Sequence, residues 1–169
     1  MHERPRLLCS PLKFGKDAMS TNTRPAQDQL LASVQTAKNR LHYLSHNDWM
    51  LLVDRAKQVA FKKGDVFIQQ GSHSKTLYII AAGKVNVSIS GAALAQIGPG
   101  EICGEMAFLE DSRPSATATA EEEVHAFSIE WEKLAELFEL FPHLASRFYR
   151  SLAVNLSRRL RDQIVQKKR

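Results

Sequence analysis

The sequence has little that would place this protein in a membrane or outside the cell. Its longest unbroken apolar run, Leu77–Ala82, is far shorter than the roughly 20 residues of a membrane-spanning helix. The first residues contain only the apolar pair Leu7-Leu8, too short for a signal-peptide core. Because no export signal is present, we expect the only two cysteines, Cys9 and Cys103, to be reduced thiols in a cytoplasmic protein.

Residues typical of enzyme active sites and metal centres are also scarce. Spacing reveals no arrangement of serine, histidine and acid, and the run Glu121-Glu122-Glu123 is typical of a solvated turn. Most of the histidines lie in tail or helical segments without companion ligands. We therefore expect no enzyme, no metal and no cofactor. A haem site through Cys103 with His73 or His125 is the one alternative, and visible absorbance of the purified protein would reveal it.

Basic residues are concentrated at the two ends of the chain. The net charge is +5, yet residues 25–144 carry ten Lys and Arg against fifteen acids. Residues 1–24 carry five against two, and residues 145–169 carry eight against one. Such ends can attract nucleic acid or an anionic membrane surface. Solvated helix ends are the commoner cause, so a nucleic-acid-binding role ranks third among the functions considered below.

Hydrophobic periodicity predicts helices in the first third of the chain. Residues 1–25 contain three prolines and no periodic apolar pattern, which predicts an extended or disordered arm. Residues 26–56 predict two helices, the first over residues 26–44. The second opens at Ser45, a helix N-cap with Asp48 three residues later.

The remaining two thirds change period twice. Residues 57–130 alternate apolar and polar side chains in some eight short segments separated by turns, which predicts an antiparallel β-roll or jelly roll. Residues 131–169 return to a period of 3.6 and predict a short helix, interrupted by Pro142, and then a long one. The predicted fold is mainly β, with flanking helices. The long helix has a wide apolar stripe of Leu144, Ala145, Phe148, Tyr149, Leu152, Leu156, Leu160 and Ile164.

The segment from Glu101 to Thr117, which we name the cassette, has the composition of an anion site. Gly104 lets the backbone approach a ligand, and the apolar residues after it can form helical turns whose free N–H groups point at an anion. Glu105, at the mouth of that turn, is suited to accept hydrogen bonds from sugar hydroxyls beside a phosphate. Arg113 can supply a charge-assisted bond to the phosphate. The pattern therefore predicts a phosphate-binding site.

Five blocks around the cassette resemble the cyclic nucleotide-binding domain shared by the catabolite activator protein, protein kinase A regulatory subunits and cyclic-nucleotide-gated channels. The order and spacing of the blocks are specific, and the similar region runs from about Leu41 to Asp162. The resemblance implies a jelly roll (a double-stranded β-helix) whose long C-terminal helix swings toward the ligand as a lid. The blocks are FKKGDV at 61–66, QG at 70–71, LYIIAAGKV at 77–85, IGPGE at 97–101 and GEMA at 104–107.

The resemblance also implies a ligand site for cyclic AMP or cyclic GMP. Backbone N–H groups bind the cyclic phosphate, a glutamate binds the ribose 2′-hydroxyl, and apolar barrel residues surround the base. For Val85 and Val87, packing in the barrel core is the commoner role. The residues are Gly104, Met106 and Ala107 for the phosphate, Glu105 for the ribose, Ser115 and Ala116 for the phosphate or base, and Val85, Val87 and Cys103 for the base pocket.

The sequence departs from the family pattern at one position. Counted from Gly104, the family places its arginine where this chain has Pro114, and Arg113 stands one residue earlier. Proline has no charge and no N–H. A one-residue slip along a strand points Arg113 to the opposite face, whereas a β-bulge would restore its direction. The loss of one charge-assisted bond would weaken ligand binding about 10- to 150-fold.

Three functions follow from these patterns, and the first is favoured. The first is a cyclic nucleotide sensor whose ligand moves the C-terminal helix, with self-association or a separate effector protein as the readout. The second is a degenerate interaction module that no longer binds nucleotide. The third is nucleic-acid binding through the basic end of the last helix, in a transcription-regulator-like protein that lacks its helix-turn-helix. The sequence leaves open cyclic AMP or cyclic GMP, dimer or monomer, and Met1 or Met19 as the start.

Overall fold

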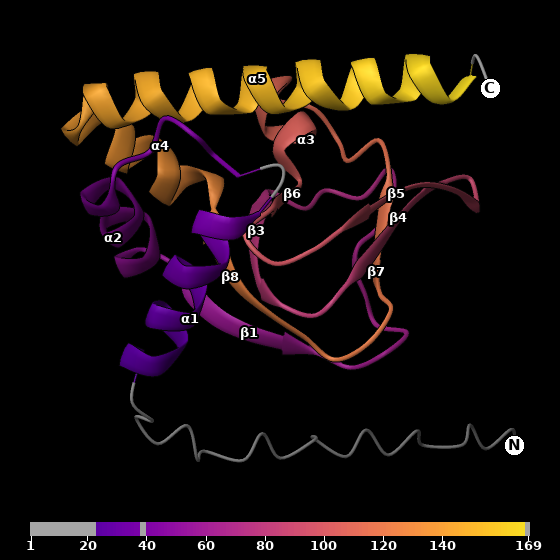
Figure 1. Ribbon diagram of the computed structural model, residues 1–169, viewed down its shortest axis with the longest axis horizontal. Helices are drawn as coiled ribbons and strands as arrows, with labels where there is room; N and C mark the ends of the chain where they lie inside the picture. Colours follow the sequence, from indigo (N-terminus) through magenta and orange to yellow (C-terminus); the bar gives the residue numbers. More distant parts are fainter. Residues whose placement is uncertain (1–22, 38–39, 168–169) are drawn as a thin grey trace, which may run out of the picture.

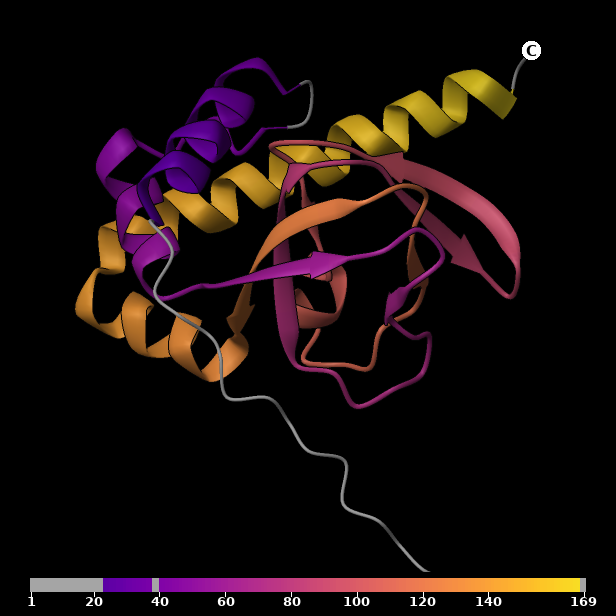
Figure 2. The same cartoon turned by 90° about the horizontal axis from the view of Figure 1, so that it is seen from below.

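The structure is a computed structural model, and it describes residues 23–37 and 40–167 (Figures 1 and 2). A roll of short strands is flanked by helices along one side and one edge. The helices are α1 (Thr23–Thr36), α2 (His46–Asp54), α3 (Glu105–Leu109), α4 (Trp131–Leu140) and α5 (Pro142–Lys167). The strands are β1 (Lys57–Phe61), β2 (Val66–Ile68), β3 (Thr76–Ala82), β4 (Val85–Ile89), β5 (Ala92–Ile97), β6 (Ile102–Cys103), β7 (Thr117–Ala120) and β8 (Val124–Glu130).

The strands form two four-stranded antiparallel sheets. Their orders are β1-β8-β3-β6 and β2-β7-β4-β5. Consecutive strands often lie in different sheets, so the chain winds between two layers as it does in a roll. This confirms the predicted mainly β fold with flanking helices and a long C-terminal helix. The short strand β6 was not predicted, because two residues cannot display a period.

The alternation along β3 gives the sheet β1-β8-β3-β6 two apolar faces. Ile80 points into the roll, where it packs with residues of the second sheet such as Val85. Its neighbours Leu77 and Ile79 point outward and pack with residues of α1, α2, α4 and α5. Alternate side chains of a strand lie on opposite faces. One sheet thus serves two hydrophobic cores. The inner core lies inside the roll, and the outer core lies between this sheet and the helices, which it fixes to the roll.

The first predicted helix is wrong in its length. α1 ends at Thr36, and the apolar residues Leu41 and Leu44 lie in non-helical chain before α2. The Ser33 hydroxyl donates to the carbonyl of Leu30, and the Thr36 hydroxyl donates to that of Ser33. Such local bonds compete with continuation of the helix. The helical spacing correctly marked Leu41 as buried, but burial is reached there by an irregular segment. The predicted arm, residues 1–25, lies outside the described residues except for 23–25, which belong to α1.

The starts of α2 and α5 follow the signals that predicted them. Ser45 caps α2 by accepting a bond from the Asp48 N–H, and the Asp48 carboxylate accepts one from the Ser45 N–H, which completes a capping box. Pro142 separates α4 from α5 and is the first residue of α5, where its missing N–H costs nothing.

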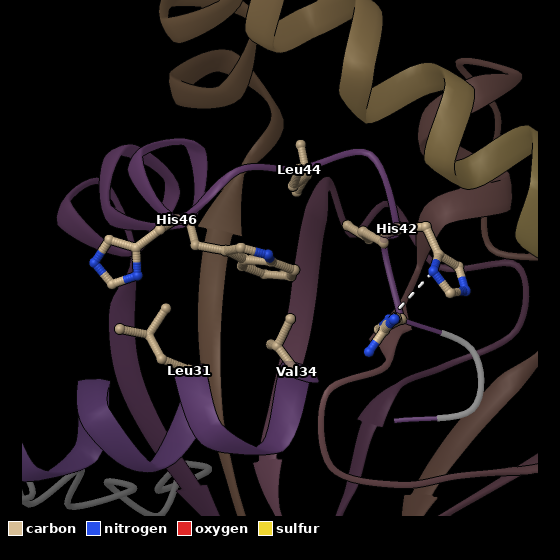
Figure 3. Close-up of a pocket in the computed structure, with 8 residues that line it drawn as sticks. Leu31, Val34, His42, Leu44 and His46 are labelled. Atoms are coloured by element: carbon tan, nitrogen blue, oxygen red, sulfur yellow. Dashed lines mark hydrogen bonds between the residues drawn. The ribbon is translucent and has the colours of Figure 1, made fainter. Parts of the chain in front are cut away.

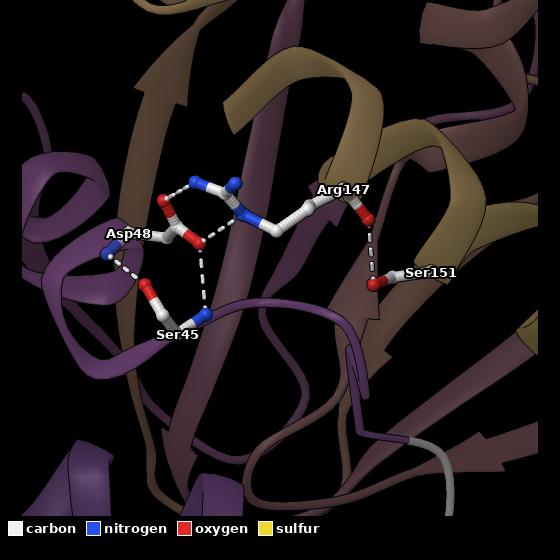
Figure 4. A network of polar contacts seen from close by, with 4 residues as sticks. All are labelled: Ser45, Asp48, Arg147 and Ser151. Atoms are coloured by element: carbon white, nitrogen blue, oxygen red, sulfur yellow. Dashed lines mark hydrogen bonds and ion pairs between the residues drawn. The ribbon is translucent and has the colours of Figure 1, made fainter. Parts of the chain in front are cut away.

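A polar network joins α2 to α5 (Figure 4). The buried carboxylate of Asp48 accepts two bonds from the Arg147 guanidinium, of 2.6 and 2.7 Å. One turn further along α5, Ser151 accepts a bond of 3.0 Å from the backbone N–H of Tyr43. Burial by itself would raise the pKa of Asp48, but the bonds from Arg147 and Ser45 outweigh it and lower that pKa below its ordinary value. The network therefore fixes the first half of α5 to the N-terminal helices.

Among the described residues, no helix combines the length and the hydropathy needed to cross a membrane.

Candidate functional site

Within the cassette, β6 turns into α3 close to the middle of α5 (Figure 1). Gly104 occupies the N-cap of α3 with a φ of +90°, in the left-handed region. A Cβ built there would lie 2.9 Å from the backbone oxygen of Thr76. Glycine is therefore required both by the turn and by the neighbouring strand β3.

The first N–H groups of α3 have no acceptors within their own helix. Bonding within the turn begins at Phe108, whose N–H donates to the Gly104 carbonyl over 3.3 Å. The predicted phosphate ligands Met106 and Ala107 stand at the start of this turn, with Met106 45% exposed and Ala107 buried. The structure thus brings Gly104, Glu105, Met106 and Ala107 together at one end of α3.

Glu105 is buried beside this turn and paired with a residue that sequence reasoning missed. Its Oε1 accepts a hydrogen bond of 2.5 Å from Nη1 of Arg159 on α5, and its side chain is only 7% exposed. A buried carboxylate without a counter-charge is costly. Arg159 was one of several basic residues at the end of α5, and a pattern of spacing could not single it out.

The second part of the cassette lies in extended chain before β7. Pro114 is buried and its carbonyl accepts a bond of 2.8 Å from the Gly71 N–H, whereas Arg113 and Ser115 are exposed and Ala116 is partly buried. Burial continues in alternation through Ala118 and Ala120 of β7. Arg113 therefore stands on the solvent side of this segment, and among the described residues no ion pair involves its guanidinium.

The predicted base-pocket residues lie in the core of the roll. Val85 is fully buried, Val87 is partly buried, and the Cys103 thiol is buried. Burial, and after it the charge of Glu105, raise the pKa of Cys103 far above its ordinary value, so the thiol stays protonated. Val85 thus has the packing role that was the commoner alternative.

Three aromatic residues near these positions were not predicted as site residues. The rings of Phe61 and Phe67 are stacked with centroids 4.5 Å apart, and Tyr78 meets both edge-on. All three are partly buried against the inner core. Their sequence signal was only that of barrel core.

The haem alternative finds no geometric support in the structure. Cys103 is buried in the inner core, whereas His73 and His125 are exposed. Within residues 23–37 and 40–167, no group of three or more His, Cys, Asp or Glu side chains lies close enough to hold a metal ion.

Two cavities lie away from the cassette. One, of about 190 Å³, opens between α1, α2 and the segment that joins them (Figure 3). The other, of about 280 Å³, lies against β1, β3 and β8. In the first, His42 contacts Arg158 and accepts a bond from Arg40, and burial together with these two charges lowers the pKa of His42.

The comparisons with known proteins agree with this architecture. The family model described as "Cyclic nucleotide-binding domain" matches residues 58–140. The Pycsar effector protein BcPycTIR of Burkholderia cepacia is 34% identical over 70% of this chain and 39% of its own length. The Cyclic AMP receptor protein of Thermus thermophilus is 31% identical over 72% of this chain and 56% of its own length. The chain thus spans well under two thirds of these relatives.

A solved structure gives the same result in three dimensions. The crystal structure of the Thermus thermophilus Catabolite Activator Protein superposes with a TM-score of 0.63 and 29% identity, and the match covers 78% of this chain and 62% of that chain. The family model covers β1 to α4, including the whole cassette. The sequence match over the roll and the shared architecture show that residues 58–140 of this chain form a cyclic nucleotide-binding domain.

Proposed function

We propose that this chain is a regulatory sensor that binds a 3′,5′-cyclic nucleotide, cyclic AMP or cyclic GMP, at the cassette. The observation that carries the proposal is the buried carboxylate of Glu105 beside the left-handed turn at Gly104. Burying a carboxylate costs free energy unless its oxygens have donors. In the proposed complex, one oxygen of Glu105 accepts a bond from the ribose 2′-hydroxyl, and the N–H groups that open α3 face the phosphate.

The signal in this proposal is a movement of the second half of α5. Arg159 connects that half to Glu105, which is the residue proposed to bind the ribose. A ligand that changes the surroundings of Glu105 also changes the free energy of docking α5, and so shifts the equilibrium between two helix positions. The proposal assigns the chain no catalytic step and a cytoplasmic location.

The readout in this proposal is a contact made by α5. Leu160, Ile164 and Val165 are 59%, 48% and 56% exposed. Exposed apolar side chains on one helix favour contact with a second copy of the chain or with an effector protein. Either contact would respond to ligand if α5 moves.

A second candidate, a degenerate interaction module, is favoured by one observation. Pro114 is buried where the family arginine stands, and Arg113 faces solvent. The cassette therefore offers the phosphate N–H groups, but no cation at the position of the family arginine.

Titration calorimetry with cyclic AMP and with cyclic GMP separates the two candidates. The sensor predicts binding, and Glu105→Gln should weaken it by about 10- to 150-fold, because a charge-assisted hydrogen bond contributes about 1.5–3 kcal/mol. Glu110→Gln is the matched control, since Glu110 is an exposed glutamate at the other end of α3. Thermal melting of both variants tests their folding. No heat from either nucleotide at millimolar concentration would leave the degenerate module.

A further inference from the structure

The cassette's own arginine faces solvent, yet a guanidinium reaches Glu105 from another part of the chain. Arg159 lies 54 positions after Glu105 in sequence, and its Nη1 is 2.5 Å from Glu105 Oε1. Its side chain is 25% exposed, so it is held between the helix and the cassette but open on one side. Arg113, the cassette's own arginine, is exposed on the outer side of its segment.

The other cations around the cassette are engaged elsewhere. Lys75 lies 3.4 Å from Asp111 and also stands over the ring of Trp131. Arg158, the neighbour of Arg159, contacts His42 on the other side of α5. Among the described residues, Arg159 is therefore the cation that touches a predicted ligand-binding residue.

The hydrogen-bonding capacity of the pair leaves room for a ligand. A carboxylate has two oxygens with about four acceptor positions, and a guanidinium has five donors. The Glu105–Arg159 bond joins Oε1 to Nη1, so it uses one acceptor position of the carboxylate and one donor of the guanidinium. A ribose hydroxyl can therefore bind Oε2 while Arg159 stays in place, with the other donors of Arg159 still available.

The covalent structure of the ligand places its charge within reach of this guanidinium. In a 3′,5′-cyclic nucleotide, the carbon that bears the 2′-hydroxyl is bonded to the carbon that bears the 3′ phosphate ester. A cation paired with the carboxylate that holds the hydroxyl is thus next to the phosphate. Arginine is also the side chain best suited to bind phosphate through two parallel bonds.

We propose that Arg159 of α5 supplies the phosphate-binding guanidinium that the cassette lacks at position 114, where it has a proline. This inference rests on the proposed function and adds to it that the anion site is shared between the cassette and the C-terminal helix. Full affinity then requires α5 to be docked. Ligand binding and helix docking are the same event rather than two events coupled through intervening residues.

The test is calorimetry of Arg159→Ala with cyclic AMP and with 2′-deoxy cyclic AMP. Cyclic GMP and its 2′-deoxy form replace them if the wild-type chain prefers guanine. The expected loss is about 10- to 150-fold for both members of the pair, because the phosphate is present in both. The matched control is Arg161→Ala, an exposed arginine on the same helix that bonds to Ser157, and it should bind like the wild type.

The analogue distinguishes a phosphate ligand from a residue that only positions Glu105. If Arg159→Ala weakens cyclic AMP but not the 2′-deoxy analogue, Arg159 acts through the Glu105–hydroxyl contact and the inference is wrong. Equal affinity of the variant and the wild type for cyclic AMP overturns it too. Absence of binding to the wild-type chain is a different result, since it rejects the proposed function itself.

A rescue experiment completes the test and does not depend on the stability of one variant. In the double variant Pro114→Arg/Arg159→Ala, the family arginine returns to the cassette while α5 loses its own. We expect this chain to bind cyclic nucleotide more tightly than Arg159→Ala alone. If Arg159→Ala fails to fold, Arg159→Lys replaces it: it keeps the charge but loses the planar fork, and a loss for both nucleotides is again expected. Unchanged affinity of Arg159→Lys for both nucleotides would then count against the inference.

Discussion

The two halves of α5 have the same sequence pattern but different surroundings. In residues 142–155, Leu144, Phe148 and Leu152 are at most 1% exposed and belong to the outer core. In residues 156–167, Leu160 and Ile164 continue the same stripe but are about half exposed. The first half is part of the folded core, whereas the second half lies along the roll without being buried in it.

Polar contacts follow the same division. The first half is held by the bidentate pair of Asp48 and Arg147 and by the bond between Tyr43 and Ser151, and these join it to the N-terminal helices. The second half is held by single contacts, from Arg159 to Glu105 and from Arg158 to His42. Fully burying a large apolar side chain contributes about 1.5–3 kcal/mol, so the first half must dominate the stability. The second half is left available for a ligand to control.

Truncating one leucine in each half tests most directly whether the two halves of α5 differ in burial. Leu152→Ala should lower the free energy of unfolding by about 2–5 kcal/mol, because Leu152 is completely buried and its removal leaves a cavity. Leu160→Ala should lower it by less than about 0.5 kcal/mol. Urea unfolding measures both. If Leu160→Ala costs as much as Leu152→Ala, the second half is buried in solution, as in a stable dimer, and the two halves are alike.

A change at Asp48 tests the polar clamp of the first half. Asp48→Asn should cost about 1–3 kcal/mol, because it removes a charge-assisted pair whose Arg147 side is 42% exposed, which reduces the effect below that of a fully buried pair. Chemical unfolding at neutral pH measures it. Asp54→Asn, an exposed acid at the end of the same helix, is the control and should have little effect.

The same variant has a pH dependence of known sign. The pKa of Asp48 is lower in the folded protein than its ordinary value of 3.8. Its contribution to stability is therefore present above about pH 3.8 and is lost as the pH falls through the lower folded-state value. Unfolding curves between neutral and strongly acidic pH should show a smaller loss of stability in Asp48→Asn than in the wild type. A variant that loses as much stability in acid as the wild type would contradict the clamp.

The most local effect is expected at the second half in the absence of ligand. Arg159→Ala leaves Glu105, whose side chain is 7% exposed, without its counter-charge, so amides of residues 156–167 should exchange hydrogen at least about two- to fivefold faster, which corresponds to about 0.4–1 kcal/mol. Amides of residues 142–155 should be unchanged, and Arg161→Ala should leave both halves unchanged. Hydrogen exchange with mass spectrometry resolves the two segments. Uniformly faster exchange along the helix would show that α5 responds as one unit.

The comparison also explains which site residues could be predicted. Gly104, Glu105, Met106 and Ala107 are adjacent in sequence, so a turn and a helix start bring them together by local geometry. Arg113 was predicted because it is close in sequence, but the alternation of the segment before β7 places it on the solvent side. Arg159 could not be predicted, because its contact with Glu105 depends on where α5 crosses the cassette.

Features that depend on residues close together in the chain could be predicted from the sequence. The period-two segments became strands of a roll, Ser45 and Asp48 closed a capping box, and Pro142 began the long helix. Each depends on backbone geometry and hydrogen bonds within a few positions. These local rules were sufficient for the fold class and for the place of the cassette.

Which half of α5 is buried, and which arginine contacts Glu105, depends on tertiary packing. The pairs Asp48–Arg147 and Glu105–Arg159 join residues 99 and 54 positions apart. An apolar stripe or a basic helix end is the same in sequence whether it faces a core, a ligand or solvent. The difference arises from packing against distant segments, because burial and ion pairing depend on which surfaces meet after the chain has folded.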